Sequence, residues 1–413
     1  MKRMASKKRR AHRRLRIVVI LAIFAGLIAG VPYIVHKIQR LSSSELPVFE
    51  KYSPSAGNES EPYTDILIAA AGDIMFHQTQ LDSAYDINKK TYDFKSVFED
   101  IKPIISAADL AIANFETTTA GSGRPYSGYP LFNSPDEVID AIQYAGFDVL
   151  TTANNHSLDT GSEGLKRTVA AIQSKGMDTV GTYNKKPDSR VLMKEVKGIK
   201  VAILSYTEST NGLGGSYAAD ELNAMINLMD KAAIVNDLRE AKGLGADLII
   251  AFMHWGDEYE EQPNAKQVEY AQVMAEEGAD LILGSHPHVI QRSEFIETEA
   301  HSAFVIYSMG NFISNQRRET LDSRNELTED GIIVTINIRK NNKTNETVIQ
   351  QIEYIPTWVY RDKEEGQSRY TYRILPVDAF LDSGDLSAVF KQRMQRSRDA
   401  TAAKMDKALS IKK

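Results

Sequence analysis

Short apolar runs alternate with amphipathic stretches along most of the chain after residue 63. Continuous apolar runs predict buried strands at 64–72, 109–114, 147–154, 199–207, 246–253, 279–285 and 303–310. Apolar residues at helical spacing predict helices at 94–107, 134–146, 161–176, 229–245, 264–278 and about 386–409. Strands that alternate with amphipathic helices predict an α/β fold built in layers.

Local signals refine two of these elements. Ser134 is expected to cap the helix at 134–146, with Pro135 at its first position and Gly146 as its stop. The segment 190–196 is expected to pair with the next strand through a Lys197-Gly198 turn.

Two later segments, 331–340 and 346–356, flank the polar turn NNKTN and predict an antiparallel hairpin. The main run of strands and helices comes before this hairpin. We therefore expect the later hairpins to form a second sheet packed on the first.

The first 35 residues form a basic segment followed by an uncharged apolar run. Residues 17–35 carry no charge, and nineteen residues at ~1.5 Å each span roughly 28 Å, close to the thickness of a bilayer core. Since basic residues precede the run, we predict an anchor with the C-terminal body outside the cytoplasm. A cleaved signal peptide is the main alternative, because small residues lie near a possible cleavage site, and a buried core helix is a third.

The expected organisation is a basic cytoplasmic segment at 1–16, a transmembrane signal anchor at 17–35, a flexible linker at 36–62, an α/β domain at 63–360 and a partly helical C-terminal extension at 361–413. The predicted location is therefore the cell membrane, with a single membrane-spanning segment.

Charge is distributed unevenly along the chain. The net charge is −6, but residues 1–40 carry eleven Lys or Arg and no Asp or Glu, so the rest holds 38 basic and 55 acidic groups. An acidic body lacks the basic face that nucleic-acid binding requires, so we expect no nucleic-acid partner. Because the chain has no cysteine, disulfides, thiolate metal sites and a catalytic Cys are excluded.

Metal-type ligands follow the predicted strands at their carboxyl ends. The residues concerned are Asp73 and His77, Glu116, Asn155 and His156, His254, His286 and His288, and Asn311. In open α/β sheets, ligands bind outside the carboxyl ends of the strands, so these groups converge if the strands are neighbours. Mixed imidazole and carboxylate groups favour Mn, Zn or Fe, and we predict one or two such divalent ions.

The acidic positions have ordinary alternatives. Asp73 can act as a helix cap, and Glu116 can be a surface charge. If the turn after Asp73 is helical, His77 shares a face with it and one metal can contact both, although His77 can instead contact substrate or another ligand. As a metal ligand, Glu116 can bridge two ions.

The motifs that contain histidine also have more than one interpretation. The Asn155-His156 pair suggests an amide ligand followed by a catalytic acid or base, with a simple turn as the alternative. His254 is a predicted ligand at its strand end. His286 and His288 flank a rigid proline, so two imidazoles can serve one site or two adjacent sites.

The loop 123–135 contains Arg124 and two tyrosines, which line the pocket or pack as ordinary loop residues. We assign Arg124, Asn114 and Asn311 to substrate binding. Neither a Gly-x-Ser-x-Gly elbow nor a Walker loop nor a dinucleotide glycine fingerprint is present.

Six motifs occur in a characteristic order: GDIMFH, NFETT, TTANNHSLDTG, MHWGDEY, GSHPHVIQ and YSMGNFISNQ. From about Asp65 to Asn315 the chain resembles the CapA family of capsule-synthesis proteins, which includes the membrane-anchored component of poly-γ-glutamate synthesis. The resemblance implies membrane polymer synthase or export subunits as partners, and an anionic polymer such as poly-γ-glutamate.

CapA proteins are in turn similar to calcineurin-like metallophosphoesterases. That resemblance implies a four-layer αββα sandwich with two metals, for which Asp73, Glu116 as the bridging group, Asn155, His156, His254, His286 and His288 match the superfamily pattern. Met75 stands where that pattern has His, with His77 two places later, and Asn154 replaces a glycine.

Two functional hypotheses follow. In the first, the chain is a metal-dependent hydrolase or transferase, in which His156 protonates the leaving group. Its substrate is the capsule polymer or, alternatively, a phosphoester unrelated to capsule. In the second, the chain is a non-catalytic accessory of a polymer export complex, and metal bridges its acidic body to polymer carboxylates.

Overall fold

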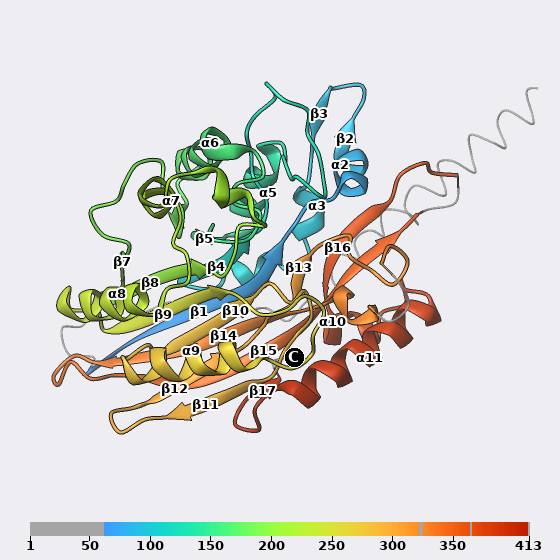
Figure 1. Ribbon diagram of the computed structural model, residues 1–413. Coiled ribbons are helices and arrows are strands. Elements are labelled where there is room, and N and C mark those ends of the chain that lie inside the picture. The colour runs from blue at the N-terminus through green and yellow to red at the C-terminus, as the bar shows by residue number, and fades with distance from the viewer. Residues whose placement is uncertain (1–61, 322–324, 364–365, 412–413) are drawn as a thin grey trace, which may run out of the picture. The chain divides into compact units, whose positions relative to one another are not determined.

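The computed structural model describes residues 62–321, 325–363 and 366–411 (Figure 1). The predicted segments 1–16 and 17–35, and all of the linker 36–62 except its last residue, lie outside this part of the chain. Among the described helices, none combines the length and the apolar character needed to cross a membrane.

Two large sheets carry the fold. The first has nine strands, seven of them in the order β16-β15-β14-β1-β4-β5-β6, with β13 beside β1 and β17 beside β15. Its strands are β1 (Tyr63–Ile74), β4 (Leu110–Phe115), β5 (Val149–Thr151), β6 (Asp178–Val180), β13 (Asn311–Ile313), β14 (Asp330–Asn341), β15 (Thr347–Asp362), β16 (Thr371–Pro376) and β17 (Ser410–Ile411).

The second sheet has six strands in the order β11-β12-β10-β9-β8-β7. They are β7 (Leu192–Val196), β8 (Ile199–Thr207), β9 (Leu248–His254), β10 (Leu281–Ser285), β11 (Ser293–Glu297) and β12 (Ser302–Ile306). A separate hairpin pairs β2 (Tyr85–Asp86) with β3 (Thr91–Tyr92).

The α-helices are α2 (Gln78–Ala84), α3 (Lys95–Phe98), α4 (Lys102–Ile105), α5 (Glu137–Ala145), α6 (Gly161–Ser174), α7 (Ala219–Met225), α8 (Lys231–Gly243), α9 (Ala265–Glu276), α10 (Val377–Leu381) and α11 (Ala388–Lys404), with 3₁₀ turns η1 (Leu213–Ser216) and η2 (Glu326–Glu329).

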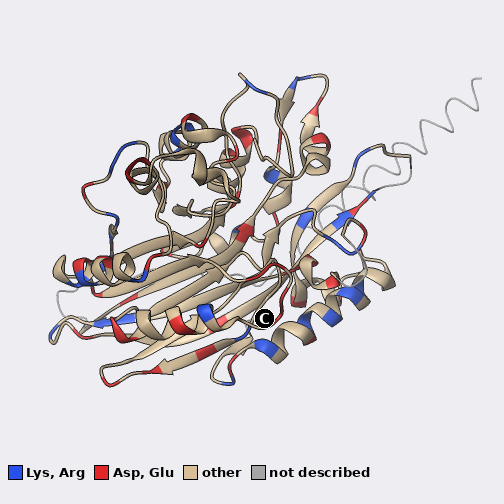
Figure 2. Cartoon of the chain, viewed as in Figure 1, with Lys and Arg blue, Asp and Glu red and all other residues tan. Residues whose placement is uncertain are grey.

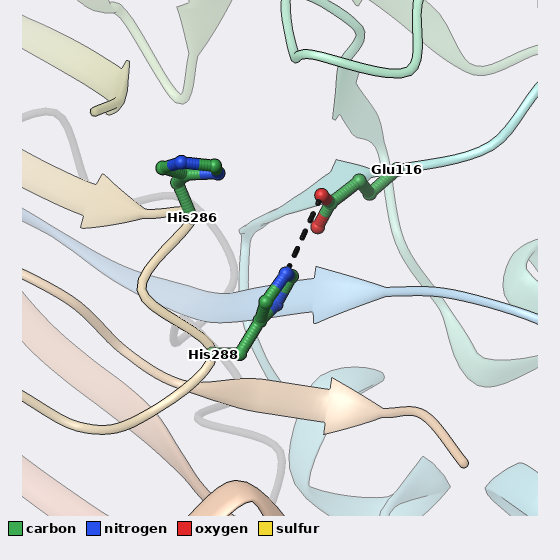
Figure 3. Close-up of side chains that lie close together, drawn as sticks. All are labelled: Glu116, His286 and His288. Atoms are coloured by element: carbon green, nitrogen blue, oxygen red, sulfur yellow. Dashed lines mark ion pairs between the residues drawn. The ribbon is translucent and has the colours of Figure 1, made fainter. Parts of the chain in front are cut away.

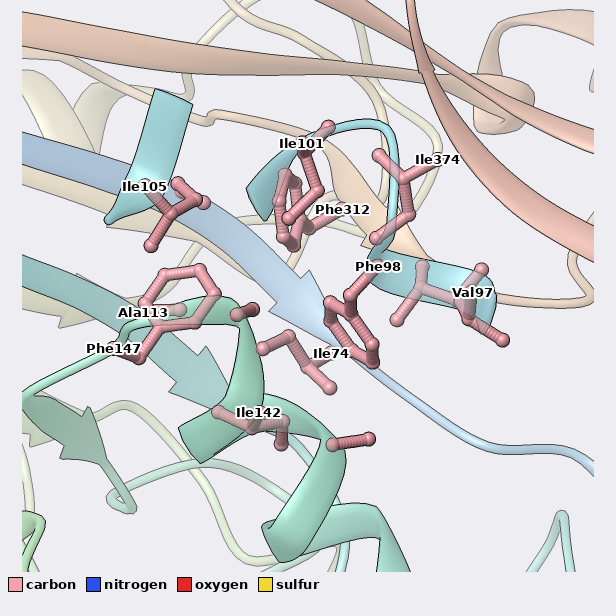
Figure 4. Close-up of a cluster of buried hydrophobic side chains, with 14 of the residues drawn as sticks. Ile74, Val97, Phe98, Ile101, Ile105, Ala113, Ile142, Phe147, Phe312 and Ile374 are labelled. Carbon is pink, nitrogen blue, oxygen red and sulfur yellow. The ribbon is translucent and has the colours of Figure 1, made fainter. Parts of the chain in front are cut away.

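Three apolar clusters separate the layers. One lies between the two sheets, where Ile68 of β1 and Ile250 of β9 are fully buried. A second packs the outer face of the nine-stranded sheet against α3, α4, α5 and α6 (Figure 4). The third packs the six-stranded sheet against α8 and α9, through residues such as Leu238 and Met274. The order helix, sheet, sheet, helix gives four layers and confirms the α/β prediction.

Strand β1 has a continuous apolar sequence, without hydrophobic alternation, because both of its faces are buried. Successive side chains of a strand point to opposite faces. Ile68 and Ala70 therefore enter the cluster between the sheets, while Ala69 and Ala71 enter the cluster under the helices. Since both faces are covered, every position from 68 to 74 is buried.

The later hairpin was wrongly assigned to a second sheet. Strand β14 pairs antiparallel with β1, so the hairpin β14–β15 extends the first sheet, and β16 continues it. The second sheet comes from the middle of the chain, residues 192–306. Hydrophobic pattern describes each strand separately and carries no information about which free edge it joins.

Two helices differ from their predictions, since one is divided into two and the other begins later. The stretch 94–107 forms two short helices, α3 and α4, because Pro103, in the first turn of α4, has no N–H to continue a helix from α3 and its ring would clash with the preceding turn. Helix α5 starts after Asp136, while Ser134 is buried and its hydroxyl bonds that of Thr117. Gly146 ends α5 in the left-handed conformation, as predicted.

The other local predictions agree more closely. Strands β7 and β8 pair antiparallel across Lys197 and Gly198, both with positive φ. The strand expected at 147–154 is reduced to β5, Val149–Thr151, and its last predicted residues leave the sheet toward Asn155.

The C-terminal segment is joined to the nine-stranded sheet. The predicted boundary at residue 360 falls inside β15, and helix α11 packs beside this strand with Met394 fully buried. Lys and Arg along α11 (Figure 2) pair with acids elsewhere in the fold. These ion pairs are Arg393–Glu319 at 2.6 Å, Arg396–Asp330 at 3.0 Å and Arg398–Asp378 at 2.5 Å.

Candidate metal centre

The centre begins at the carboxyl end of β1. Gly72 immediately precedes Asp73, and a Cβ atom at Gly72 would lie 2.0 Å from the carbonyl oxygen of Gly310. Only glycine permits this approach of two backbones. It brings β13 beside β1 and fixes the backbone from which the buried Asp73 carboxylate projects.

Two overlapping groups of ligand atoms meet where the two sheets end. In the first, one ligand atom each from Asp73, Glu116 and His254 lies within 4.8 Å of the others. In the second, the same holds for Glu116, His286 and His288 (Figure 3). Glu116 belongs to both groups, as expected of a carboxylate between two ions.

Short interatomic distances connect the two groups of ligand atoms. Glu116 Oε1 lies 3.5 Å from His254 Nε2 and 3.9 Å from His288 Nε2. Asp73 Oδ2 lies 3.5 Å from His288 Nδ1 and accepts the His286 backbone N–H at 3.1 Å. The residues that meet here are up to 215 positions apart in the sequence.

Glu116 is in an unusual state for an acidic side chain. It is completely buried, and neither carboxylate oxygen has a hydrogen-bond partner among the described residues. Burial, followed by the charge of Asp73, raises its pKa well above the ordinary value. A buried carboxylate without a partner is costly, and a bound cation would remove that cost.

The surrounding histidines are shifted toward their neutral form. Burial, followed by His286 and His288, lowers the pKa of His254 well below its ordinary value. Burial, followed by His288, lowers the pKa of His286 to about 4. Neutral imidazoles are the form that binds metals, so these rings can accept a cation at neutral pH without losing a proton.

His254 is held from both sides of its ring. Its Nε2 lies 3.0 Å from Asn155 Oδ1, while its Nδ1 lies 3.0 Å from the Ser285 hydroxyl and 3.2 Å from Asn114 Nδ2. Asn114 also donates to Asp73 Oδ1 at 2.8 Å. Asn155 therefore stands beside the centre, and Asn114 connects two of its members.

His156 lies at the edge of the centre with its own acidic partner. Its Nδ1 is 2.8 Å from Asp159 Oδ2, which also accepts the Phe132 backbone N–H at 2.7 Å. The Phe132 ring meets the His156 ring edge to face at 4.7 Å. The aspartate and the aromatic ring together fix the imidazole and leave Nε2 as its second nitrogen.

His77 occupies a different position from the ligand groups. The turn after Asp73 is not helical, since β1 continues to Ile74 and His77 is extended, so the two residues do not share a helix face. His77 Nδ1 accepts the Asn315 N–H at 3.3 Å, and desolvation followed by His288 lowers its pKa to about 4. It belongs to neither group of ligand atoms within 4.8 Å.

The three predicted substrate contacts have different surroundings. Asn114 and Asn311 are buried and hydrogen-bonded to members of the centre, since Asn311 Oδ1 is 3.1 Å from His288 Nδ1. Arg124 is exposed in its loop, where its carbonyl accepts from Asn133. Contact with substrate stays a prediction for all three.

Several partners of the centre were missed from the sequence. Ser285 contacts His254, Asp159 contacts His156, and Tyr259 packs over His288 at 6.0 Å between ring centroids. Asp159 lies three residues after His156, a spacing that signals a local side-chain pair. Ser285 and Tyr259 lie within the motifs GSHPHVIQ and MHWGDEY, but Ser and Tyr are frequent in proteins of every function, so their residue types do not indicate these roles.

The donor set fits a divalent cation. It combines carboxylate oxygens, imidazole nitrogens and an amide oxygen, which suits Mn, Zn or Fe. The unpartnered Glu116 oxygens and the neutral histidines fit the same interpretation. Asp73, Glu116, His254, His286 and His288 would hold the ion or ions, with Asn155 beside them.

The four layers and the imidazole–carboxylate cluster at the strand ends define a layered α/β protein with a candidate divalent-metal centre. Comparison with protein families then gives the family. A model described as bacterial capsule synthesis protein PGA_cap matches residues 67–316, which is more than half of the chain, so the chain belongs to this family. The resemblance to CapA proteins is thereby confirmed.

Individual relatives agree with the family. The chain is 28% identical over 373 residues to the capsule biosynthesis protein CapA of Bacillus anthracis, covering 88% of this chain and 80% of the relative. It is 29% identical over 250 residues to the PGA biosynthesis protein CapA of Bacillus subtilis, covering 60% of this chain and 62% of the relative.

Among solved structures, two more distant similarities are found. The NAD nucleotidase of Haemophilus influenzae has a TM-score of 0.45 at 12% identity, covering 85% of this chain and 64% of the nucleotidase. The calcineurin-like phosphoesterase YfkN of Bacillus subtilis has a TM-score of 0.40 at 15% identity, covering 83% of this chain and 99% of the other.

Proposed function

We propose that the chain is a metal-dependent hydrolase or transferase that acts on poly-γ-glutamate during capsule synthesis or export, at the outer face of the cell membrane. One observation carries the enzymatic part of the proposal. The fully buried Glu116 carboxylate has no hydrogen-bond partner among the described residues, and it lies within 4.8 Å of ligand atoms of three histidines and of a second carboxylate. Membership of the capsule-synthesis family supports the polymer as substrate.

The proposed location rests on charge and length. Residues 17–35 are long enough to span a bilayer core, and the basic residues before them favour a cytoplasmic N-terminus. The catalytic body then faces the side where capsule polymer leaves the cell. Membrane synthase or export subunits are the partners that such an anchored protein would meet.

The side chains of the centre divide the chemistry between them. A divalent cation held there would polarise the substrate carbonyl or phosphoryl oxygen and acidify a water molecule. His156 is placed to deliver a proton, because Asp159 orients its Nδ1 and leaves Nε2 for the leaving group. Phe132 packs on this imidazole and keeps it in one orientation.

The test uses the purified protein, with His288→Ala as the disabling variant. We would measure bound metal, release of glutamate oligomers from poly-γ-glutamate, and hydrolysis of bis-p-nitrophenyl phosphate. His301→Ala is the matched control, because His301 bonds the Ala279 carbonyl and Thr298 and contacts no residue of the centre. We expect His288→Ala to lose metal and activity and His301→Ala to keep both.

Different failures have different meanings. A wild-type protein that binds no divalent metal would overturn the enzymatic proposal. Metal binding without either hydrolysis would favour a non-catalytic accessory that uses metal to bridge its acidic body to polymer carboxylates. Hydrolysis of the phosphodiester alone would favour a phosphoesterase unrelated to the polymer.

A further inference from the structure

Three unusual backbone conformations meet beside the centre. Among the described residues, seven non-glycine positions have positive φ, and four of them belong to polar surface turns. The other three are Tyr259 at 68°, His286 at 98° and His288 at 59°. Such conformations are sparsely populated for these residue types and persist where surrounding contacts enforce them.

Tyr259 makes two direct contacts with the histidine turn. Its backbone N–H donates to the Pro287 carbonyl at 2.8 Å, and Pro287 separates the two histidines. Its ring lies 6.0 Å from the His288 ring, tilted by 39°. The tyrosine therefore holds the turn through its backbone and covers one imidazole with its side chain.

A chain of hydrogen bonds returns from the tyrosine hydroxyl to the same imidazole. Gln316 Nε2 donates to the Tyr259 hydroxyl at 3.3 Å, and Asn311 Nδ2 donates to Gln316 Oε1 at 3.1 Å. Asn311 Oδ1 then lies 3.1 Å from His288 Nδ1. Together with the ring contact, these hydrogen bonds form a closed network around His288.

This hydrogen-bond network determines which nitrogen of His288 carries a proton. Asn311 Nδ2 faces three acceptors, the Gln316 side chain at 3.1 Å, the Thr328 carbonyl at 3.0 Å and the His288 carbonyl at 3.4 Å. Asn311 Oδ1 is therefore the atom toward the ring, and an amide oxygen only accepts. His288 Nδ1 must donate, which leaves a lone pair on Nε2, the nitrogen nearest Glu116.

The loop that carries Tyr259 is itself fixed. Gln291 Nε2 donates to the carbonyls of Glu260 at 2.9 Å and Gln262 at 3.1 Å. Lys404 of helix α11 pairs with Glu261 at 3.0 Å. These contacts hold the loop of Tyr259 in place beside the histidine turn.

We propose that Tyr259 is a positioning residue of the centre, which holds His288 in the orientation and tautomer that present Nε2 as a metal ligand. The inference rests on the proposed metal-dependent function. Tyr259 is the last residue of the MHWGDEY motif, and His254 of the same motif ends β9, so one motif both contributes a ligand and aligns another.

Two variants of Tyr259 test it in the full-length protein. Tyr259→Phe removes the hydroxyl and keeps the ring and the backbone donor. Tyr259→Gly removes the ring but suits the positive φ, so the fold is kept. Loss of such supporting contacts weakens metal binding 10–100-fold, so we expect about 10-fold for Phe and about 100-fold for Gly in Zn²⁺ and Mn²⁺ competition titrations.

Lys90→Gly is the matched control. Lys90 also has positive φ, at 56°, but lies in the β2–β3 turn, and we expect its metal affinity to equal that of the wild type. In chelator, Tyr259→Gly should still unfold in one cooperative transition, which separates lost positioning from lost folding.

The metal-free protein gives a second measurement. Nitrogen chemical shifts of labelled histidine should show His288 with its proton on Nδ1 in the wild type and a mixture of tautomers in Tyr259→Phe. Equal metal affinity and equal tautomers in all proteins would overturn the inference and leave the proposed function standing. If the wild type binds no metal, the proposed function fails, and unchanged tautomers would then reject the positioning role separately.

Discussion

Replacing Glu116 by Gln should stabilise the metal-free protein while destroying its response to metal. In the part of the chain that the structure describes, the fully buried carboxyl has no hydrogen-bond partner, and its pKa is raised well above the ordinary value of 4.5. Because the folded pKa is the higher one, the stability that this group contributes is complete below about pH 4.5 and is lost as the pH rises toward the folded value.

The magnitude follows from the cost of protonation. For each pH unit between the ordinary and the raised pKa, the free energy of unfolding falls by about 1–1.5 kcal/mol. Gln carries no charge, but its buried amide retains about 1 kcal/mol of unmet hydrogen bonding. We therefore expect metal-free Glu116→Gln to be less stable than the wild type by up to about 1 kcal/mol near pH 4.5, and to become the more stable protein as the pH rises toward the raised pKa.

Metal should reverse the order. At a free metal concentration of 1,000 times Kd, binding adds about 4 kcal/mol to the wild type and little to a variant without the charge. Urea unfolding of both proteins at pH 4.5 and 6.5, with chelator and with Mn²⁺ or Zn²⁺, provides the four comparisons. The reasoning fails if chelated Glu116→Gln is the less stable protein at pH 6.5, or if metal stabilises both proteins equally.

Three further predictions concern the same region. Metal binding at pH values below the raised pKa of Glu116 should release a proton from this carboxyl, whereas His286, with a pKa of about 4, is already neutral at pH 7; calorimetry in buffers of different ionisation enthalpy measures this, and release of two or more protons would contradict it. His156→Ala should lower kcat about 10²–10⁴-fold with little change in metal affinity, whereas parallel loss of metal would make His156 a ligand. Gly72→Ala should destabilise the protein by about 3 kcal/mol or more, since its Cβ would lie 2.0 Å from a backbone oxygen. Gly123→Ala is the control, because a Cβ at Gly123 would have nothing within 4 Å. Equal unfolding midpoints of the two variants would refute the packing argument.

The candidate ligands of the centre followed from a general property of α/β sheets. Asp73 and Glu116 follow neighbouring parallel strands of the nine-stranded sheet, while His254 ends a strand of the six-stranded sheet. The apolar runs and the residues after them were enough to select these candidates, because parallel strands bring their carboxyl ends to one edge of a sheet. That the edges of two sheets meet was decided by the packing of the sheets.

The supporting contacts depended on the tertiary structure. Tyr259 and Gln316 are 57 residues apart and meet only because their loops fold over the same histidine. His77 belongs to neither ligand group, and it does not share a helix face with Asp73 because β1 continues past Asp73 in place of a helical turn. Local propensity does not encode either arrangement.

What the amino-acid sequence determined by itself was the kind of element at each position and the chemistry at its end, since both depend on neighbouring residues. The tertiary structure alone decided that the late hairpin β14–β15 joins β1 in the first sheet, and which side chains surround His254 and His288. Strand pairing and side-chain orientation depend on contacts between residues tens to hundreds of positions apart, whose stability is shared across the whole fold.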